Sequence, residues 1–174
     1  MKTLTDHLAQ YAAYHRDPRN IATHFIGVPM IVLAVATLLS NPAIMAGPVP
    51  VSLATLVTGA TCIFYWRLDV RLGAVMTLLL ALTLAVAHWL ATMDTAHWLM
   101  AGVGLFVVGW AIQFLGHYYE GKKPAFVDDL VGLLVGPLFL VAETSFFLGM
   151  RLDVKAAVEL RVGAVHRRDA VASA

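Results

Sequence analysis

The chain has 174 residues, of which 60% are hydrophobic and 13% are charged. Soluble domains carry roughly 25% charged residues, so this composition indicates an integral membrane protein. The formal net charge of +1 leaves no basic surface of the kind that nucleic-acid binding needs. The single cysteine, Cys62, excludes a disulfide framework.

Five apolar segments follow one another along the chain. Four are long and uncharged enough to be predicted as membrane-spanning α-helices, at residues 21–39, 51–66, 72–93 and 97–117. The fifth, residues 130–150, contains Gly136-Pro137, which interrupts a helical hydrogen-bond ladder. It also contains Glu143, which is costly in hydrocarbon unless it is paired or buried in the bundle.

The predicted fold is therefore an all-α, polytopic membrane helix bundle. Four helices span the membrane, and the fifth segment is a broken helix that is re-entrant or interfacial. With a polar basic tail at 151–174, these segments form a single integral membrane domain of residues 1–174. The alternative, an ordinary fifth span, would place the tail on the opposite side of the membrane.

The loops between the predicted helices differ in charge. Residues 41–50 and 93–97 contain no Lys or Arg, so all twelve basic residues lie elsewhere in the chain. They precede the first helix, join the second to the third, follow the fourth or lie in the tail. By the positive-inside rule both termini are cytoplasmic, at the inner membrane in a bacterium or the endoplasmic reticulum in a eukaryote.

Three histidines are expected at the cytoplasmic ends of the predicted helices. His15 and His24 flank the start of the first helix, in the stretch YHRDPRNIATHFIGVP, and His117 ends the fourth. His88 lies about 25 Å from this face at 1.5 Å of rise per residue, and His97 lies in the outer loop. Only the first three are therefore expected to meet.

The local spacing supports that meeting. Pro18 disfavours helical geometry before it and can start a new helix, so an amphipathic N-terminal helix is free to fold back over the bundle. Asn20 and His24, four residues apart, share one face of the first membrane helix. On the fourth, Gln113, His117 and Glu120 form one stripe, which is predicted to face the first.

Three imidazoles and the carboxylate of Glu120 satisfy the ligand needs of a divalent transition metal. A mixed histidine and carboxylate set with open positions is typical of non-haem Fe(II) sites that activate oxygen, although spacing alone does not name the metal. The alternative is that these histidines cap helices or contact lipid headgroups.

Most of the remaining polar residues near this face have two possible roles. Glu143 either contributes to the metal site, as a ligand or as an acceptor for a ligand, or bonds a helix end or another buried polar group. Arg16 and Arg19 either set the topology or hold a substrate carboxylate through the planar guanidinium. Asp128 and Asp129 are expected to cap a helix at the membrane surface.

The stretches YHRDPRNIATHFIGVP, WAIQFLGHYYEGKKPAFVDDL and GPLFLVAE together resemble the Mpo1-like family, also known as domain of unknown function 962. The similarity extends from Tyr11 to Gly149. It implies an Fe(II)-dependent membrane dioxygenase that shortens long-chain 2-hydroxy fatty acids by one carbon, in an α-oxidation. Residue by residue, it matches the family's histidines and acids to His15, His24, His117, Glu120 and Glu143.

On this resemblance, Fe(II) and O2 are expected at a site near the headgroup level, where a fatty acid presents its carboxylate. The expected catalytic residues are His15, His24, His117 and Glu120, with Glu143 as a further metal residue, and the expected substrate contacts are Arg16, Arg19 and Asn20. Two other classes fit the same residues. One is another metal-dependent lipid enzyme, such as a zinc hydrolase, and the other is a non-enzymatic lipid-binding membrane protein with structural histidines.

The charge pattern generates a first prediction. A reporter fused after residue 174 should be located in the cytoplasm, because a crossing fifth segment would export five basic residues. A reporter in the loop at 93–97 should lie on the opposite side and serves as the control. An external location for the C-terminal fusion would overturn the predicted topology.

Overall fold

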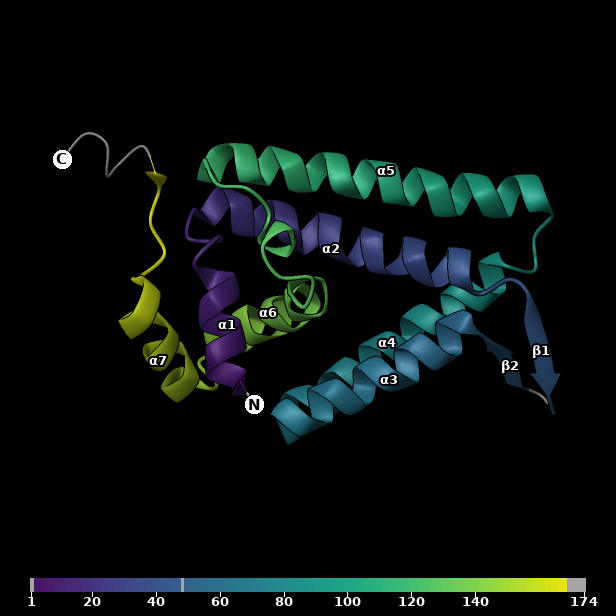
Figure 1. Ribbon diagram of the computed structural model, residues 1–174, viewed down its shortest axis with the longest axis horizontal. Helices are drawn as coiled ribbons and strands as arrows, with labels where there is room; N and C mark the ends of the chain where they lie inside the picture. The colour runs from purple at the N-terminus through teal and green to yellow at the C-terminus, as the bar shows by residue number, and fades with distance from the viewer. Residues whose placement is uncertain (1, 48, 169–174) are drawn as a thin grey trace. The chain divides into compact units, whose positions relative to one another are not determined.

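The structure is a computed structural model that describes residues 2–47 and 49–168. It is helical apart from one short two-stranded ladder, which confirms the predicted all-α class (Figure 1). In chain order the elements are α1 (Leu4–Ala12), α2 (Pro18–Leu39), β1 (Ala43–Ala46), β2 (Val49–Ser52), α3 (Leu53–Leu68), α4 (Val70–Leu90), α5 (Thr95–Glu120), η1 (Ala125–Val127), α6 (Gly132–Phe147) and α7 (Leu152–Val162). The chain divides into two compact units, residues 1–28 with 111–174 and residues 29–110.

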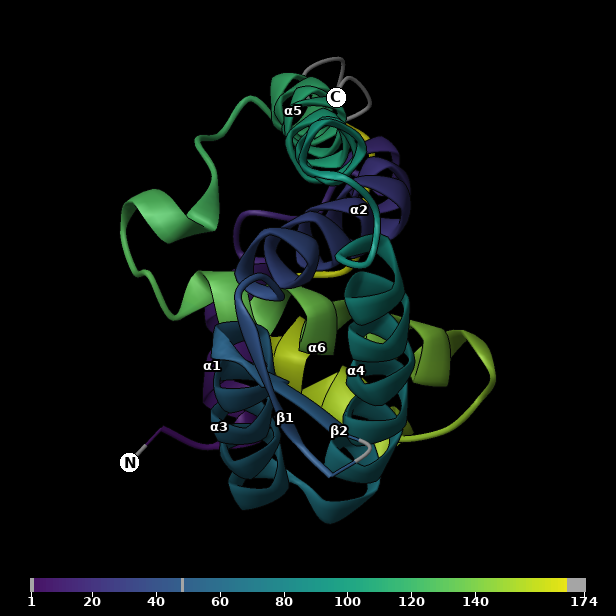
Figure 2. The same cartoon turned by 90° about the vertical axis from the view of Figure 1, so that its right-hand side faces the viewer.

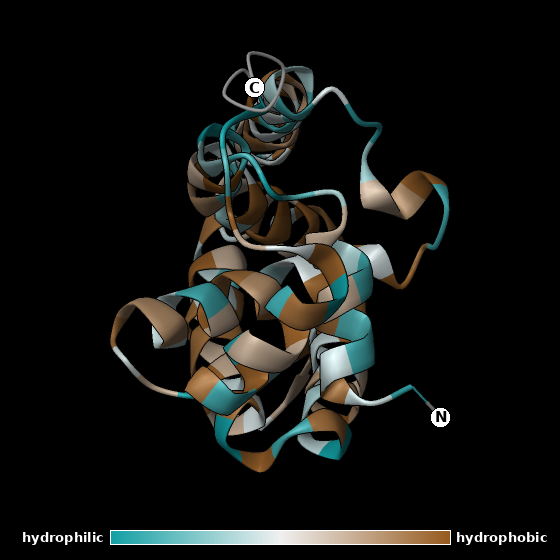
Figure 3. Ribbon diagram, turned by 90° about the vertical axis from the view of Figure 1, so that its left-hand side faces the viewer, coloured by the Kyte–Doolittle hydropathy of each residue, from teal (hydrophilic) through white to brown (hydrophobic). Residues whose placement is uncertain are grey.

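The long helices have the composition of membrane spans. Three of them, α2, α4 and α5, are long and apolar enough to cross a bilayer, and α6 and α7 together pass the same test as a bent pair. Hydrophobic residues run along these helices in the hydropathy view (Figure 3). The second predicted span, residues 51–66, corresponds to α3, which is apolar but has 16 residues, fewer than the about 20 that a perpendicular crossing needs.

In the first unit, α1 packs against α6 and α7. A capping box starts α1, in which the Thr3 hydroxyl accepts from the Asp6 N–H and the Asp6 carboxylate accepts from the Thr3 N–H. The same carboxylate accepts a hydrogen bond of 2.7 Å from Arg161 on α7. The N-terminal helix is thus tied to the end of the chain, and its other end leads directly to His15.

A tight connection joins α1 to α2. The N–H groups of Tyr14 and His15 bond back to carbonyls of α1, and Pro18 then occupies the first position of α2. Proline suits that position because its φ angle is already helical and it has no N–H to satisfy. Asp17 Oδ1 accepts from the Arg19 N–H at 2.9 Å and so caps the new helix.

The predicted broken fifth segment is present, but the break lies elsewhere. Sequence analysis placed the interruption at Gly136-Pro137, whereas α6 continues through Pro137 to Phe147. A proline near the start of a helix removes only one hydrogen bond, which the surrounding packing tolerates. The chain turns instead at Gly149 and Arg151, which have φ angles of +74° and +53°, and α7 leaves at 114° to α6.

The second unit contains a close helical hairpin of α3 and α4, which run side by side in Figures 1 and 2. Only Asp69 separates the two helices, and its side chain caps α4 through the Leu72 N–H at 2.9 Å. Gly73 permits the approach, since a Cβ there would lie 3.0 Å from the backbone of Trp66. The β1–β2 ladder, which sequence analysis expected as loop, pairs Ala43 with Ser52 in antiparallel register.

Candidate metal centre

The structure brings His15, His24 and His117 together in the first unit. His15 lies in the connection before α2, His24 on the second turn of α2 and His117 on the last turn of α5. Their ring centroids are 4.4 Å apart for His15 and His24, and 5.1 Å apart for each of the other two pairs. All three side chains are buried, and one potential ligand atom from each lies within 4.8 Å of the others.

Hydrogen bonds fix the tautomers of two of these rings. The Nδ1 of His15 bonds the Tyr11 carbonyl at 2.7 Å, and the Nδ1 of His24 bonds the Asn20 carbonyl at 2.8 Å. A carbonyl can only accept, so each Nδ1 carries the proton and each Nε2 of a neutral ring offers a lone pair. The two Nε2 atoms face each other at 2.9 Å. Two lone pairs at this distance repel unless a proton or a metal cation lies between them.

The burial of His15 favours a metal ion over a shared proton between the two Nε2 atoms. It lowers the pKa of His15 well below its usual value, and the neighbouring His24 lowers it further. Burial therefore favours the neutral ring over a ring that shares a proton with His24. The Nδ1 of His117 is also buried and bonds none of the described residues. Three neutral imidazoles with unused lone pairs fit a divalent transition metal, and backbone carbonyls orient two of them as metal-binding histidines usually require.

Glu120 lies one turn beyond His117, but its carboxylate is engaged by other groups. Both oxygens accept from the Arg16 N–H at 3.0 Å, and Oε2 also accepts from the Asp17 N–H at 2.8 Å and from Asn20 Nδ2 at 3.1 Å. The carboxylate thus binds N–H groups just before α2, where the helix dipole also favours negative charge. It holds the connection that carries His15 and lies outside the group of converging ligand atoms.

Arg16 is 4% exposed, and its guanidinium donates hydrogen bonds to backbone carbonyls. Nε donates to the carbonyls of Ala12 and His15, and Nη1 donates to that of Gly163, each at 3.0 Å. The remaining nitrogen, Nη2, lies 3.9 Å from a carboxylate oxygen of Glu143 on α6. The structure therefore places Glu143 beside Arg16, as the predicted partner of a buried polar group.

The other two residues assigned to the substrate also have protein partners. Arg19 donates to both carboxylate oxygens of Asp17, at 3.0 and 2.8 Å, and its guanidinium lies over the ring of Tyr119. These hydrogen bonds hold the pKa of Asp17 below its ordinary range. Asn20 donates to Glu120 and to the Tyr14 carbonyl. Both residues thus stabilise the start of α2.

The C-terminal segment, residues 163–168, is attached to this same connection. The His166 N–H donates to the Arg16 carbonyl, and the Arg168 N–H donates to Asp17 Oδ2, both at 3.0 Å. Gly163 turns the chain towards Arg16 with φ +80° and ψ 166°, a conformation open essentially to glycine alone. A cavity of about 570 Å³ adjoins the segment, lined in part by His166 and Arg168.

Tyr11 belongs to the histidine cluster, although sequence reasoning did not select it. Its ring stacks on that of His15, with centroids 4.1 Å apart and planes within 8°, and lies edge-on to His24 at 6.5 Å. Phe139 on α6 packs against both Tyr11 and His15. The i, i+4 spacing of Tyr11 and His15 was the available signal, because residues at that spacing are neighbours on a helical face.

His88 and His97 lie in the second unit, and each has a partner there. His88 Nε2 lies 3.0 Å from the hydroxyl of Ser52, the N-cap of α3. His97 Nδ1 lies 2.5 Å from a carboxylate oxygen of Asp94. Neither belongs to the three-histidine group, in agreement with their expected depth.

These features define a helical membrane protein with a buried cluster of three histidines. The chain belongs to the Mpo1-like family, whose model, described as "2-hydroxy-palmitic acid dioxygenase Mpo1-like", matches residues 1–148. It is 33% identical to the "2-hydroxy-palmitic acid dioxygenase MPO1" of Saccharomyces cerevisiae over 159 residues, which cover 90% of this chain and 87% of the yeast protein. No solved structure matches the chain.

The Glu120 contacts generate a second prediction. Glu120→Gln should lower the free energy of unfolding by about 2 kcal/mol or more, because it removes charge-assisted hydrogen bonds and sets an amide donor against backbone N–H groups. Thermal unfolding followed by circular dichroism in detergent measures the loss. Glu159→Gln, on the more exposed helix α7, is the matched control and should change stability by less than about 0.5 kcal/mol. Equal stability of the two variants would contradict the role given to Glu120.

Proposed function

We propose that this protein is an Fe(II)-dependent dioxygenase that performs α-oxidation of long-chain 2-hydroxy fatty acids. The observation that carries the proposal is the buried cluster of His15, His24 and His117, in which two lone pairs face each other and require a cation. Membership of the Mpo1-like family and the printed activity of the yeast relative support the substrate class.

The overall reaction balances without another reductant. A 2-hydroxy acid and O2 give the acid one carbon shorter, CO2 and water. The bond between C1 and C2 breaks, C2 is oxidised from an alcohol to a carboxylic acid, and the four electrons that reduce O2 come from the substrate. The protein therefore needs to bind only a redox-active metal, the hydroxy acid and O2.

The donor set suits this chemistry. Bound by the three histidines, a ferrous ion would supply the redox chemistry and open coordination positions for the substrate and O2. Because the imidazoles are neutral, they leave the charge of a divalent ion uncompensated, which favours an anionic substrate such as a carboxylate. The protein's contribution is to hold the rings in one tautomer, to exclude water by burial and to fix the His15 connection through Glu120.

The membrane setting supports an acyl substrate. Three described helices are long and apolar enough to span a bilayer, and we expect the alkyl chain to lie in the hydrocarbon while the carboxylate reaches the headgroup level. Arg16, Arg19 and Asn20 each donate hydrogen bonds to protein groups, although Nη2 of Arg16 and Oδ1 of Asn20 have no hydrogen-bond partner among the described residues. We assign these three residues to shaping the His15 connection, and Glu143 to pairing with Arg16. The site then receives the hydroxy acid at an ion held by histidines alone.

The metal content is the first test of this proposal. Anaerobically purified protein should bind one Fe(II) per chain, and His117→Ala should lower the affinity at least about tenfold, since even groups that only orient a ligand contribute tenfold or more. Metal analysis after dialysis measures this. His97→Ala should retain full binding, because His97 pairs with Asp94 in the other unit. A preference for zinc, with no dependence on oxygen, would favour a hydrolase instead.

The reaction itself is the second test. Purified protein with 2-hydroxypalmitate, Fe(II) and air should yield the acid one carbon shorter, together with CO2, both followed by mass spectrometry. The same mixture under nitrogen should yield neither product. Turnover that persists without oxygen, or equal activity of His117→Ala and His97→Ala, would refute the proposed function.

A further inference from the structure

Tyr11 has a hydroxyl that the fold leaves unpaired. The residue is 8% exposed, and none of the described residues hydrogen-bonds its hydroxyl. Buried tyrosines usually find a partner for this group, and one without a partner calls for a physical explanation. The hydroxyl also lies so near Gly136 that a Cβ there would be 2.9 Å away, so α6 leaves room for it.

The position of Tyr11 relates this hydroxyl to the histidine cluster. The phenol is stacked on one imidazole and meets a second edge-on, so it adjoins two of the three rings. Its own carbonyl fixes the tautomer of His15. Tyr11 thus contacts His15 through both its carbonyl and its ring, and these contacts hold its hydroxyl next to the histidine cluster.

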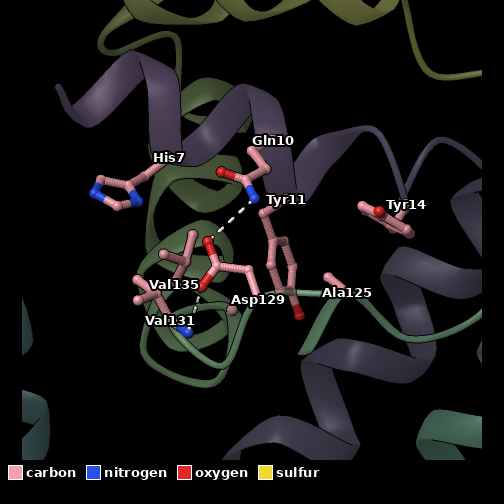
Figure 4. Close-up of a pocket in the computed structure, with 9 residues that line it drawn as sticks. His7, Gln10, Tyr11, Tyr14, Ala125, Asp129, Val131 and Val135 are labelled. Carbon is pink, nitrogen blue, oxygen red and sulfur yellow. Dashed lines mark hydrogen bonds between the residues drawn. The ribbon is translucent and has the colours of Figure 1, made fainter. Parts of the chain in front are cut away.

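Tyr11 also lines a small pocket. Figure 4 shows the Tyr11 ring reaching from α1 towards Ala125 and α6, into a pocket that Val131 and Val135 also line. The pocket has a volume of about 10 Å³, close to the size needed for one water, and none of the three histidines lines it. Its polar rim is already engaged, since Asp129 accepts from Gln10 at 3.2 Å.

Most other candidate donors near the cluster are committed to protein groups, whereas Nη2 of Arg16 and Nε2 of Gln113 have no hydrogen-bond partner among the described residues. Arg16 donates to three backbone carbonyls and faces Glu143, and Arg19 is paired with Asp17. Asn20 donates to Glu120. Among the uncommitted donors, the Tyr11 hydroxyl is the one whose ring contacts both His15 and His24, so a carboxylate that reached these two rings could accept a charge-assisted hydrogen bond from it.

We propose that Tyr11 is a substrate-binding residue, whose hydroxyl donates a hydrogen bond to a carboxylate oxygen of the fatty acid. This inference rests on the proposed function, because it takes the acid to be bound at the histidine cluster. It adds a residue that recognises the acid group without binding the metal. The rival explanation is that Tyr11 only packs against His15.

Tyr11→Phe separates the two roles, because phenylalanine keeps the stacked ring and removes only the hydroxyl. Binding is measured with metal-loaded protein under nitrogen, using 2-hydroxypalmitate and, in a second arm, palmitate. Tyr11→Phe should raise the Kd of both acids about tenfold, as expected for one charge-assisted hydrogen bond. Its metal affinity and thermal unfolding should match those of the unchanged protein.

Tyr14→Phe is the matched control. Tyr14 lies just after α1 and contacts none of the three histidine rings in the described contacts; its hydroxyl donates to Asp128 at 2.6 Å on the exposed surface, so its loss should leave both Kd values unchanged. Unchanged binding in Tyr11→Phe, a loss of metal instead of acid, or weaker binding of 2-hydroxypalmitate alone would overturn the assignment to the carboxylate. If the unchanged protein binds no metal, the proposed function fails together with this inference, whereas metal and acid binding that Tyr11→Phe does not alter overturns the inference alone.

Discussion

One buried carboxylate holds the first unit together. Glu120 ends α5 and accepts hydrogen bonds from N–H groups of Arg16 and Asp17, more than 100 residues earlier in the chain. A buried carboxylate without donors is costly, and so are N–H groups left unpaired at the start of a helix. The hydrogen bonds between them offset the desolvation free energy of both the carboxylate and the N–H groups. The connection that carries His15 is thereby fixed to the helix that carries His117.

Charged and neutral groups have separate tasks around this point. The buried charged side chains all bond protein groups. Glu120 accepts from the Arg16 N–H, Arg16 donates to the Gly163 carbonyl, and Asp17 accepts from Arg19. The imidazoles next to them remain neutral and keep their lone pairs. The three histidines of the proposed cation site are therefore not paired with the charged groups that lie around them.

The sequence predicted those features of the fold and the site that follow from the geometry of one helix. Apolar length predicted the helices, Pro18 predicted the start of α2, and helical depth separated His15, His24 and His117 from His88 and His97. These inferences needed only the geometry of a single helix.

Features that depend on contacts between distant segments were not predictable in the same way. Spacing placed Glu120 near His117. Its hydrogen bonds to the backbone N–H groups of Arg16 and Asp17 could not be predicted, because almost every residue type has a backbone N–H. The bend after α6 depends on positive φ angles at Gly149 and Arg151, and a proline inside a packed helix gave a false signal of where it lies. Tyr11 was missed because a stacked aromatic ring and an ordinary core residue look alike in sequence.

The distance along the chain between the two halves of the cluster has a consequence for biosynthesis. His15 and His24 leave the ribosome early, but His117 and Glu120 follow about a hundred residues later, which is several seconds of synthesis at 5–20 residues per second. During that interval the nascent helix exposes two histidines with no third ligand and no carboxylate to fix their loop. Binding of the proposed ion by all three histidines would therefore have to follow the synthesis of α5, so the order of synthesis sets when the complete cluster can first form.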